Sequence, residues 1–309
     1  MSAELSQLER EALDAFWRGD ATTAWDGVDD AAWIAFGLRC SLEAGRVLRA
    51  RSAAFDELVE RKGDGSPATE LEREVEREIR ERLRRFERSA AFVGEETGGT
   101  LPARGYAVAV DPVDGTWGLL SETSSWACVI AVLRDGQPLA GFVANPMTGE
   151  VAHALRGGSA RLLRLPAFGE RPVAHTLPTR SPGGNGLLVS LHPDPDAKAL
   201  RVTLHEAWRR GDLSVVRSPG GSPTWGLVEA ARGHYVYLNA WSSSPAQPFD
   251  LAAGALIVRA AGGEIVDANG KAIDATRHAG PWLAGVDADK RSRVAALVRS
   301  SWPARESRA

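Results

Sequence analysis

Cysteine is nearly absent from this chain of 309 residues, which contains only Cys40 and Cys128. The two lie far apart in the sequence, and each sits inside an apolar stretch. Such a pair does not make the disulfide framework of a small secreted protein. We therefore interpret both residues as buried thiols, which is typical of proteins in a reducing compartment.

Long apolar runs and an excess of positive charge are also missing. Apolar stretches such as Trp126–Leu133 are far shorter than the roughly 20 residues that a membrane-spanning helix needs, and the acidic residues within Met1–Ala21 argue against a signal peptide. The 37 basic and 40 acidic side chains leave a net charge of -3, so no positive field attracts nucleic acid or an anionic membrane. We expect a cytoplasmic globular protein whose partners include neither.

The first half of the chain combines two helical patterns with short strands. Apolar residues recur at helical spacing from Asp30 to about Leu58, and a second helix is predicted from near Pro67 to Arg88. In that second helix Glu and Arg alternate, and we expect this charge run to face solvent in all but the first turn. Short strands, paired antiparallel, are predicted at residues 92–93, 106–110, 126–133 and 138–144, with a hairpin turn at 134–136.

The second half alternates strands with helices after a cluster of loop-forming residues at 180–186. Strands are predicted at 187–191, 213–216 and 235–238, and helices at 196–210, 224–232 and 251–261. We expect three parts: a helical extension (1–29), an α+β domain (30–182) and an α/β domain (183–309). The extension is predicted to be a packing helix, because Leu5, Leu8, Ala12 and Phe16 follow helical spacing.

The most informative segment is Ala109–Thr116, in which an apolar strand runs into two carboxylates that flank a proline. Two neighbouring acids repel each other, and burying either costs several kcal/mol without a compensating cation. Gly115 and Thr116 follow as a flexible turn at a possible helix start, where backbone N–H groups favour a phosphate. Carboxylates for a metal beside amides for a phosphate are the groups that phosphoryl transfer requires.

Two further acidic motifs lie elsewhere in the chain. Gly94–Thr97 places paired glutamates directly after a short strand, and Asp250 stands at the start of an apolar helix. Taken alone, Asp114 and Asp250 could be helix caps, and Asp111 a turn residue. Asp250 could also be both a cap and a ligand.

Together these segments resemble the inositol monophosphatase family of magnesium-dependent, lithium-sensitive phosphatases related to fructose bisphosphatase. The family's Gly-Glu-Glu, Asp-Pro-Ile-Asp-Gly-Thr and Trp-Asp-x-Ala-Gly motifs match residues 94–96, 111–116 and 249–254 in order. Its Asp-Gly-Ser-Pro-Val-Thr segment matches residues 64–69, its glycine-serine loop matches residues 221–222, and its central hairpin matches residues 135–146. The resemblance covers most of the chain and implies a layered αβαβα sandwich, an α+β or α/β fold, with a possible homodimer.

The resemblance also implies a metal centre made of oxygen ligands. Glu95, Asp111 and the backbone carbonyl of Val113 would hold one Mg²⁺, and Asp111, Asp114 and Asp250 a second. Oxygen ligands suit magnesium, whereas zinc prefers His or Cys. The six histidines show no paired ligand spacing, so we interpret each as a surface or packing residue.

The same resemblance predicts catalysis by a metal-activated water without a covalent enzyme intermediate. Thr116 would orient this water with a carboxylate at Glu72, where the family has an aspartate whose side chain is one methylene shorter. The remaining predicted substrate contacts are Gly115, Thr116, Trp117, Gly221, Ser222 and Asn239.

Three features around the leaving group depart from the family. Trp117 follows the threonine where an asparagine and then an aromatic residue are usual, Asn239 replaces a glutamate that binds inositol hydroxyls, and the loop at 240–247 is longer. We therefore expect a phosphatase of a small phosphorylated metabolite, either inositol monophosphate or a relative's substrate. Those substrates are histidinol phosphate, fructose bisphosphate and adenosine bisphosphate.

Other functional classes find less support in the sequence. A binding or regulatory protein on the same fold stays open, because Glu72 departs from the family pattern. A serine hydrolase is not supported, because the sequence around Ser222 lacks the final glycine of a nucleophile elbow. A kinase or P-loop enzyme is not supported either, because no glycine-rich loop ends in Lys-Ser or Lys-Thr.

Overall fold

The computed structural model describes residues 2–19, 29–51, 59–61, 67–165, 171–179, 186–190, 197–217, 221–240 and 245–301. Its larger sheet has eight strands, all paired antiparallel except the last two in the order, which are parallel. In spatial order they are β1 (Ser2–Ala3), β10 (Val173–Thr176), β9 (Arg161–Arg164), β8 (Glu150–Leu155), β7 (Gln137–Asn145), β6 (Ala127–Arg134), β5 (Tyr106–Asp114) and β4 (Ala91–Gly94).

The smaller sheet has five strands and belongs to the second half of the chain. In spatial order they are β12 (Val215–Arg217), β11 (Gly186–Ser190), β13 (Tyr235–Asn239), β15 (Trp282–Gly285) and β14 (Glu264–Asp267). The first three are parallel, and the last two join antiparallel. A separate pair, β2 (Val59–Arg61) and β3 (Pro67–Thr69), lies outside both sheets.

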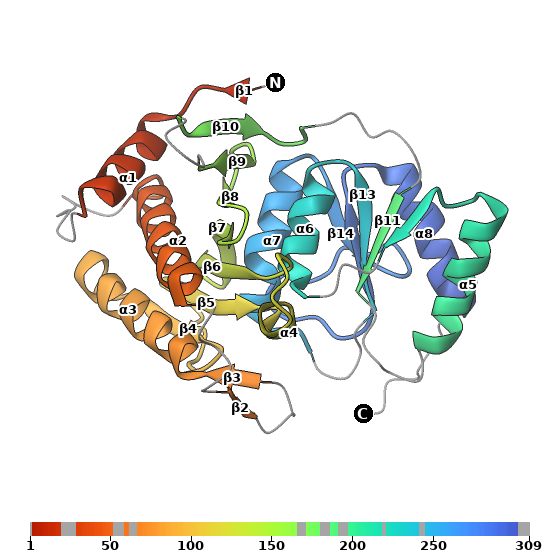
Figure 1. The fold of residues 1–309 in the computed structure, drawn as a ribbon, viewed down its shortest axis with the longest axis horizontal. Helices are drawn as coiled ribbons and strands as arrows, with labels where there is room; N and C mark the ends of the chain where they lie inside the picture. The colour runs from red at the N-terminus through yellow and green to blue at the C-terminus, as the bar shows by residue number, and fades with distance from the viewer. Residues whose placement is uncertain are drawn as a thin grey trace.

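The helices form three layers around the two sheets (Figure 1). The outer layer on the larger sheet holds α2 (Ala32–Arg51) and α3 (Glu70–Phe86), with α1 (Gln7–Arg18) packed on α2, and the middle layer holds α6 (Pro223–Ala231) and α7 (Pro248–Ala260). The outer layer on the smaller sheet holds α5 (Ala197–Arg210) and α8 (Ala288–Ser301), while the short α4 (Thr116–Leu120) follows β5. The predicted αβαβα sandwich is therefore confirmed.

Helix α7 is apolar on all sides because it contacts both sheets. Nine of its residues are buried: Pro248, Leu251, Ala252, Ala253, Gly254, Ala255, Leu256, Ile257 and Val258. At Gly141 a Cβ atom would stand 2.7 Å from the backbone of Ala253. The helix therefore lies directly on β7, and a helix without a polar face belongs in such a sandwiched layer.

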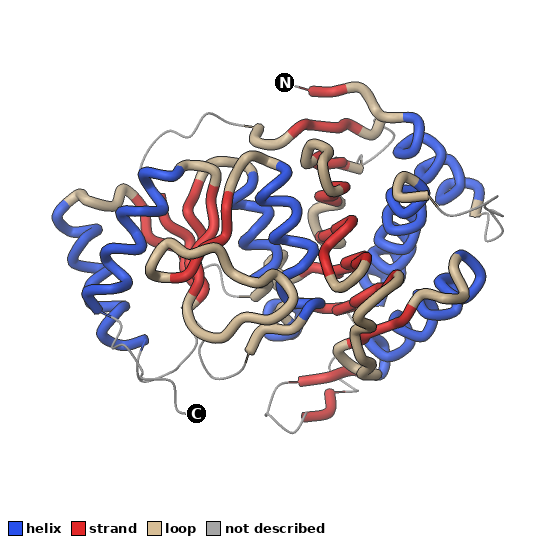
Figure 2. The backbone as a smooth tube through the Cα atoms, turned by 180° about the vertical axis from the view of Figure 1, so that it is seen from behind, coloured by secondary structure: helices blue, strands red, loops and turns tan. Residues whose placement is uncertain are grey.

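The N-terminal helix α1 docks on the larger sheet through a buried ion pair. The Glu9 carboxylate, with no exposed surface, accepts hydrogen bonds from Arg161 at 2.7 Å and contacts Nε2 of His153 at 3.0 Å. Ser6 and Glu9 also form a capping box at the helix start. Figure 2 shows the N-terminal strand alongside its neighbour at the rim of the sheet, where Ser2 pairs with His175.

Several sequence predictions match the structure and others need correction. The hairpin turn is confirmed, since Asp135 and Gly136 both have positive φ, as a type I′ turn requires. Both cysteines are buried free thiols, and burial raises the pKa of each to about 12. Helix α2 ends at Arg51; residues 52–58 lie outside the described ranges.

Two predictions about helix α3 were wrong. The helix begins at Glu70 rather than near Pro67, because residues 67–69 pair with β2 instead. Its charge run is not solvated throughout, because Glu76 is fully buried beyond the first turn.

The pairing of β4 with β5 is parallel rather than antiparallel. The segment 95–105 carries the chain back before β5 begins, so both strands run in the same direction.

The expected boundary at residues 182 and 183 falls in 180–185, outside the described residues, so the domain division stays a prediction. Within the described ranges, no helix is both long and apolar enough to span a bilayer.

Candidate active site

Two carboxylate side chains lie at the end of β5, in the larger sheet. Asp111 and Asp114 are both buried, with 3% and 8% of their surface exposed. The pairing of β5 with β6 is irregular between these two residues, and the Val113 N–H donates to the Asp111 carboxylate at 2.9 Å. A buried strand therefore delivers two acids to one place, with Pro112 limiting the backbone between them.

The turn after β5 brings two distant segments into backbone contact. Gly115 has φ of 90°, and a Cβ atom there would stand 2.4 Å from the backbone nitrogen of Ser222. The hydroxyl of Ser222 donates to the Asp114 carboxylate, and the Thr224 N–H donates to the same oxygen at 2.8 Å. The start of α6 therefore orients Asp114, a role that the sequence match of residues 221–222 had not indicated.

Asp250 lies beside this contact, at the start of α7. Its backbone carbonyl accepts a hydrogen bond from the Thr224 hydroxyl at 3.1 Å, and its carboxylate accepts from the Gln247 N–H at 2.5 Å. The cap of α7 is Gln247, so the interpretation of Asp250 as the N-cap was wrong. Asp250 is the third helical residue, whose side chain reaches back to the cap as in a capping box.

The four predicted acidic ligands interact with one another electrostatically. Burial raises the pKa of Asp111 well above 3.8, and the charges of Glu95, Asp114 and Asp250 raise it further. Burial also raises the pKa of Asp114 to about 6, against the hydrogen bonds from Ser222 and Thr224 that lower it. Neighbouring carboxylates that raise one another's pKa repel one another when ionised, and a divalent cation bound to them offsets this repulsion.

The donor set suits a hard cation in its chemistry. All four side chains are carboxylates, the ligand type that Mg²⁺ prefers. Across the described ranges, however, no three His, Cys, Asp or Glu side chains stand close enough together to hold one ion as they are oriented. Asp114 directs its Oδ2 atom at the Thr224 N–H, and Asp250 directs one carboxylate oxygen at the Gln247 N–H, so the starts of α6 and α7 orient these two acids.

Glu95 lies on a turn that is hydrogen-bonded to Glu76, a residue that we had expected to face solvent. The Glu95 N–H donates to the Val110 carbonyl at 3.0 Å. The buried carboxylate of Glu76 accepts from the N–H groups of Glu96 at 2.8 Å and Thr97 at 3.0 Å. Glu76 therefore fixes this turn against α3. Its spacing of four residues from Glu72 could have revealed it, because both then lie on one helix face.

Glu72 reaches the predicted catalytic threonine in spite of its different length. The Thr116 hydroxyl lies 3.4 Å from the Glu72 carboxylate and 3.2 Å from the Val113 carbonyl. Glu72 is almost fully buried. The extra methylene of Glu72 therefore still allows a long hydrogen bond to Thr116.

The predicted substrate residues are brought together only in part. Asn239 ends β13, and because α6 runs antiparallel to β13 and packs on it, this end lies near Ser222. Trp117 is 61% exposed beside Thr116, which excludes a role in the core. Residues 241–244 of the longer loop and residues 64–66 of the matched segment lie outside the described residues.

Comparison with known proteins shows what the chain as a whole is similar to. The profile of the inositol monophosphatase family matches residues 29–303. A histidinol-phosphatase of Mycobacterium tuberculosis is 31% identical over 236 residues, which cover 74% of this chain and 85% of that protein. An inositol-1-monophosphatase of Rhizobium meliloti is 31% identical over 219 residues, which cover 68% of this chain and 75% of that protein.

Solved structures show the same fold. The extragenic suppressor protein suhB of Bartonella henselae superposes with a TM-score of 0.72 at 23% identity, covering 87% of this chain and 98% of that one. The IMPase of Thermotoga maritima superposes with a TM-score of 0.69 at 21% identity, with the same two coverages.

Proposed function

Because this chain belongs to the inositol monophosphatase family, we propose that it is a magnesium-dependent phosphomonoesterase that acts on a small phosphorylated metabolite. One observation carries the proposal: buried carboxylates at the end of β5 raise one another's pKa, together with Glu95 and Asp250. A fold does not keep such repulsion for stability alone, since burying unpaired like charges is costly.

The proposed ligands are the carboxylates of Glu95, Asp111, Asp114 and Asp250 and the carbonyl of Val113. When bound, Mg²⁺ would supply a Lewis acid that activates water and neutralises the charge developing on the phosphoryl group. The role of the chain is to hold these oxygens in place. Ser222 and Thr224 orient Asp114, while the turn above Glu76 orients Glu95.

Thr116 and Glu72 are proposed to position the attacking water. The Thr116 hydroxyl can donate its proton to Glu72, which leaves an oxygen lone pair to accept a hydrogen bond from the water. Glu72 is buried and within reach of that hydroxyl, so it can hold the Thr116 proton in one orientation. Such positioning lowers the barrier by pre-organising the nucleophile.

Histidinol phosphate is the favoured alternative to inositol monophosphate. A histidinol-phosphatase is among the relatives, 31% identical over 236 residues. Asn239 replaces the glutamate expected for inositol hydroxyls, and the exposed face of Trp117 offers a surface for a planar ring.

A panel of phosphate esters tests the proposed function. We expect release of inorganic phosphate with Mg²⁺, none after chelation by EDTA, and inhibition by lithium. The panel contains inositol monophosphate, histidinol phosphate, fructose bisphosphate and adenosine bisphosphate. Absence of magnesium-dependent release from all four would refute the proposal and favour a binding protein on this fold.

Shortening Glu72 should lower the rate. In Glu72→Asp the carboxylate retreats by more than an ångström from the Thr116 hydroxyl, which already lies at the limit of a hydrogen bond. We expect kcat to fall by roughly tenfold with KM nearly unchanged, because the loss is in positioning. Steady-state kinetics measure both constants. A rate equal to that of the parent would remove Glu72 from the mechanism, whereas a higher rate would mean that the helix start has not adapted to the longer side chain.

Truncating Trp117 should change specificity rather than overall activity. If its ring stacks on the substrate, Trp117→Ala should lower kcat/KM for histidinol phosphate by roughly three- to tenfold, equivalent to about 1 kcal/mol. The value for inositol monophosphate should change less than twofold. Equal losses on both substrates would mean that Trp117 supports the site without contacting the leaving group.

The Mg²⁺ concentration that is needed for activity should rise at acidic pH. The pKa of Asp111 is raised and that of Asp114 is about 6, so protons compete with the cation for these oxygens as the pH falls below that value. We expect the Mg²⁺ concentration for half-maximal activity to increase by about tenfold per pH unit in this range, for one displaced proton. A constant requirement between pH 8 and pH 5 would contradict this coupling.

A further inference from the structure

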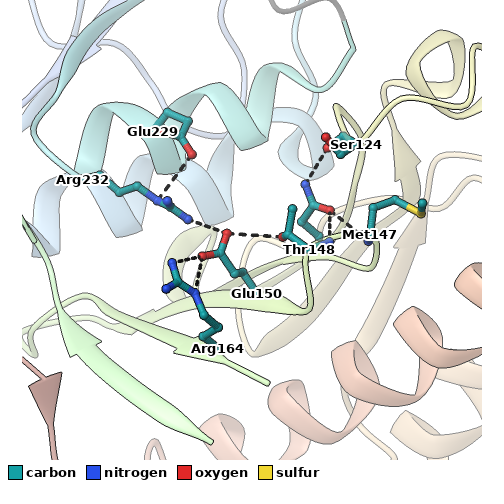
Figure 3. A network of polar contacts seen from close by, with 8 residues as sticks. Ser124, Met147, Thr148, Glu150, Arg164, Glu229 and Arg232 are labelled. Atoms are coloured by element: carbon teal, nitrogen blue, oxygen red, sulfur yellow. Dashed lines mark hydrogen bonds and ion pairs between the residues drawn. The ribbon is translucent and has the colours of Figure 1, made fainter. Parts of the chain in front are cut away.

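A network of polar side chains joins the turn between β7 and β8 to β9 and to the end of α6 (Figure 3). At its centre the buried Glu150 carboxylate accepts hydrogen bonds from Arg164 and Arg232, each at 2.7 Å. The Thr148 hydroxyl donates to it at 3.3 Å. None of these residues belongs to the proposed chemistry, yet the network links strands β8 and β9 to the end of α6.

Asn145 extends the network toward the site. It is 1% exposed, and its Nδ2 donates to the Ser124 carbonyl at 2.8 Å. Its Oδ1 accepts from the N–H groups of Met147 at 3.0 Å and Thr148 at 3.1 Å. Both ends of the amide are engaged, so the side chain has one defined orientation. The segment that Asn145 contacts, residues 121–124, is exposed; its first three residues are hydrogen-bonded to α4, and the Ser124 carbonyl is bonded to Asn145.

The residue after Ser124 touches the loop that orients Asp114. The Ser125 carbonyl accepts the Ser222 N–H at 2.7 Å, and a Cβ atom on Gly221 would stand 1.8 Å from the same carbonyl oxygen. A displacement of Ser125 must therefore displace Ser222. Since the Ser222 hydroxyl donates to Asp114, the displacement reaches the carboxylate.

The other end of α6 is fixed by the same network. Arg232 follows the last residue of the helix and binds Glu150, while Ser222 caps the start. Helix α6 is thus held at both ends by groups that connect through Thr148 and Asn145. Such an arrangement leaves Asp114 little freedom to move with the helix.

We propose that Asn145, supported by Glu150, is a positioning residue that fixes the Asp114 carboxylate through Ser124–Ser125 and Ser222. This inference rests on the proposed function only for its kinetic consequence. The claim that Asn145 fixes Ser124–Ser125 and Ser222 concerns the chain alone, and it can be tested without metal or substrate.

Asn145→Asp is the informative variant. It keeps the shape and the oxygen that accepts from Met147 and Thr148, but it removes the NH₂ group and sets an oxygen against the Ser124 carbonyl. We expect kcat to fall by about tenfold or more, because a small misplacement of a reacting geometry is costly, while KM changes little. Glu9→Gln is the control, since in the described part of the chain the buried polar cluster of Glu9 shares no hydrogen bond with Asn145 or Asp114.

A double-mutant cycle with Ser222→Ala tests the route. If Asn145 acts through Ser222, its substitution should change kcat much less in the Ser222→Ala background than in the parent. Effects that multiply independently would overturn the route.

Hydrogen–deuterium exchange of the metal-free protein supplies the structural readout. We expect Asn145→Asp to accelerate exchange in peptides covering residues 121–125 and 221–227, and Glu9→Gln to leave both unchanged. Unaltered exchange in these peptides would refute the inference even in a fully active enzyme. Accelerated exchange in a protein that hydrolyses no ester would instead refute only the proposed function.

Discussion

Asp114→Asn is expected to abolish most of the phosphatase activity while leaving the protein folded. The amide oxygen of asparagine can still accept from Ser222 and Thr224, so the contacts to α6 remain available. The lost negative charge is one that both cation affinity and charge stabilisation in the transition state require. We expect kcat to fall by about 10²- to 10³-fold, or roughly 3 to 4 kcal/mol in the barrier.

The melting temperature of Asp114→Asn shows whether Asp114 serves function or stability. Burial and the charge of Glu95 raise the pKa of Asp114 to about 6, so its ionised form is strained at neutral pH. Neutralising it should therefore leave the melting temperature unchanged or raise it. Asp135→Asn in the hairpin turn is the matched control, because it makes the same chemical change far from β5's end. Unchanged turnover in Asp114→Asn would remove Asp114 from the metal site.

Glu9→Ala is expected to cause the largest loss of stability among the changes considered. Glu9 is the shared acceptor of Arg161 and His153, and it closes the capping box of α1. Its removal leaves the partly buried guanidinium of Arg161 and the buried ring of His153 without their shared carboxylate, which costs about 3 kcal/mol, the lower end of the range for buried pairs. Urea denaturation measures the loss. Glu11→Ala on the exposed face of the same helix should change the unfolding free energy by less than about 0.5 kcal/mol.

The contribution of Glu9 should disappear in acid. Burial alone would raise its pKa, but the hydrogen bonds from His153 and Arg161 outweigh burial and hold the pKa well below 4.5. A carboxylate with a lowered folded pKa stabilises the protein above its unfolded pKa and loses that effect as the pH falls below it. The difference in unfolding free energy between parent and Glu9→Gln should therefore shrink below about pH 4.5. A difference that stays constant to pH 3 would contradict the assignment.

The layered fold and the acidic residues at the end of β5 were predictable because local patterns encode them. Short, nearly continuous apolar runs predicted the buried central strands, and an acid pair after a buried strand has few structural uses. Glu76 was missed because the alternating Glu and Arg run was interpreted as solvated beyond its first turn, although the spacing from Glu72 puts both acids on one helix face; the contacts with Glu96 and Thr97 show its burial. The short strands β8 to β10 were not predicted, although turn-forming residues at 145–149 and 156–159 bound β8 on both sides.

Contacts between segments that lie far apart in the sequence could not be predicted from sequence patterns. Nothing in the residues around Ser125 indicates that its carbonyl meets Ser222, or that Gly115 must lack a side chain to let that segment approach. The sequence correctly predicted Asp250 at a helix start, but the N-cap is Gln247. The two members of a capping box lie three residues apart, so the sequence pattern alone did not show which of them is the cap.

The middle layer makes the two halves of the chain mutually dependent for folding. Helices α6 and α7 come from the second half, yet they cover the inner face of the larger sheet as well as the smaller one. A fragment that ended before α6 would leave Val129, Ala131 and Val143 uncovered, and such a face aggregates in water. The chain should consequently lose its structure in one cooperative transition, with the acidic residues of β5 and Asp250 of α7 separating at the same moment.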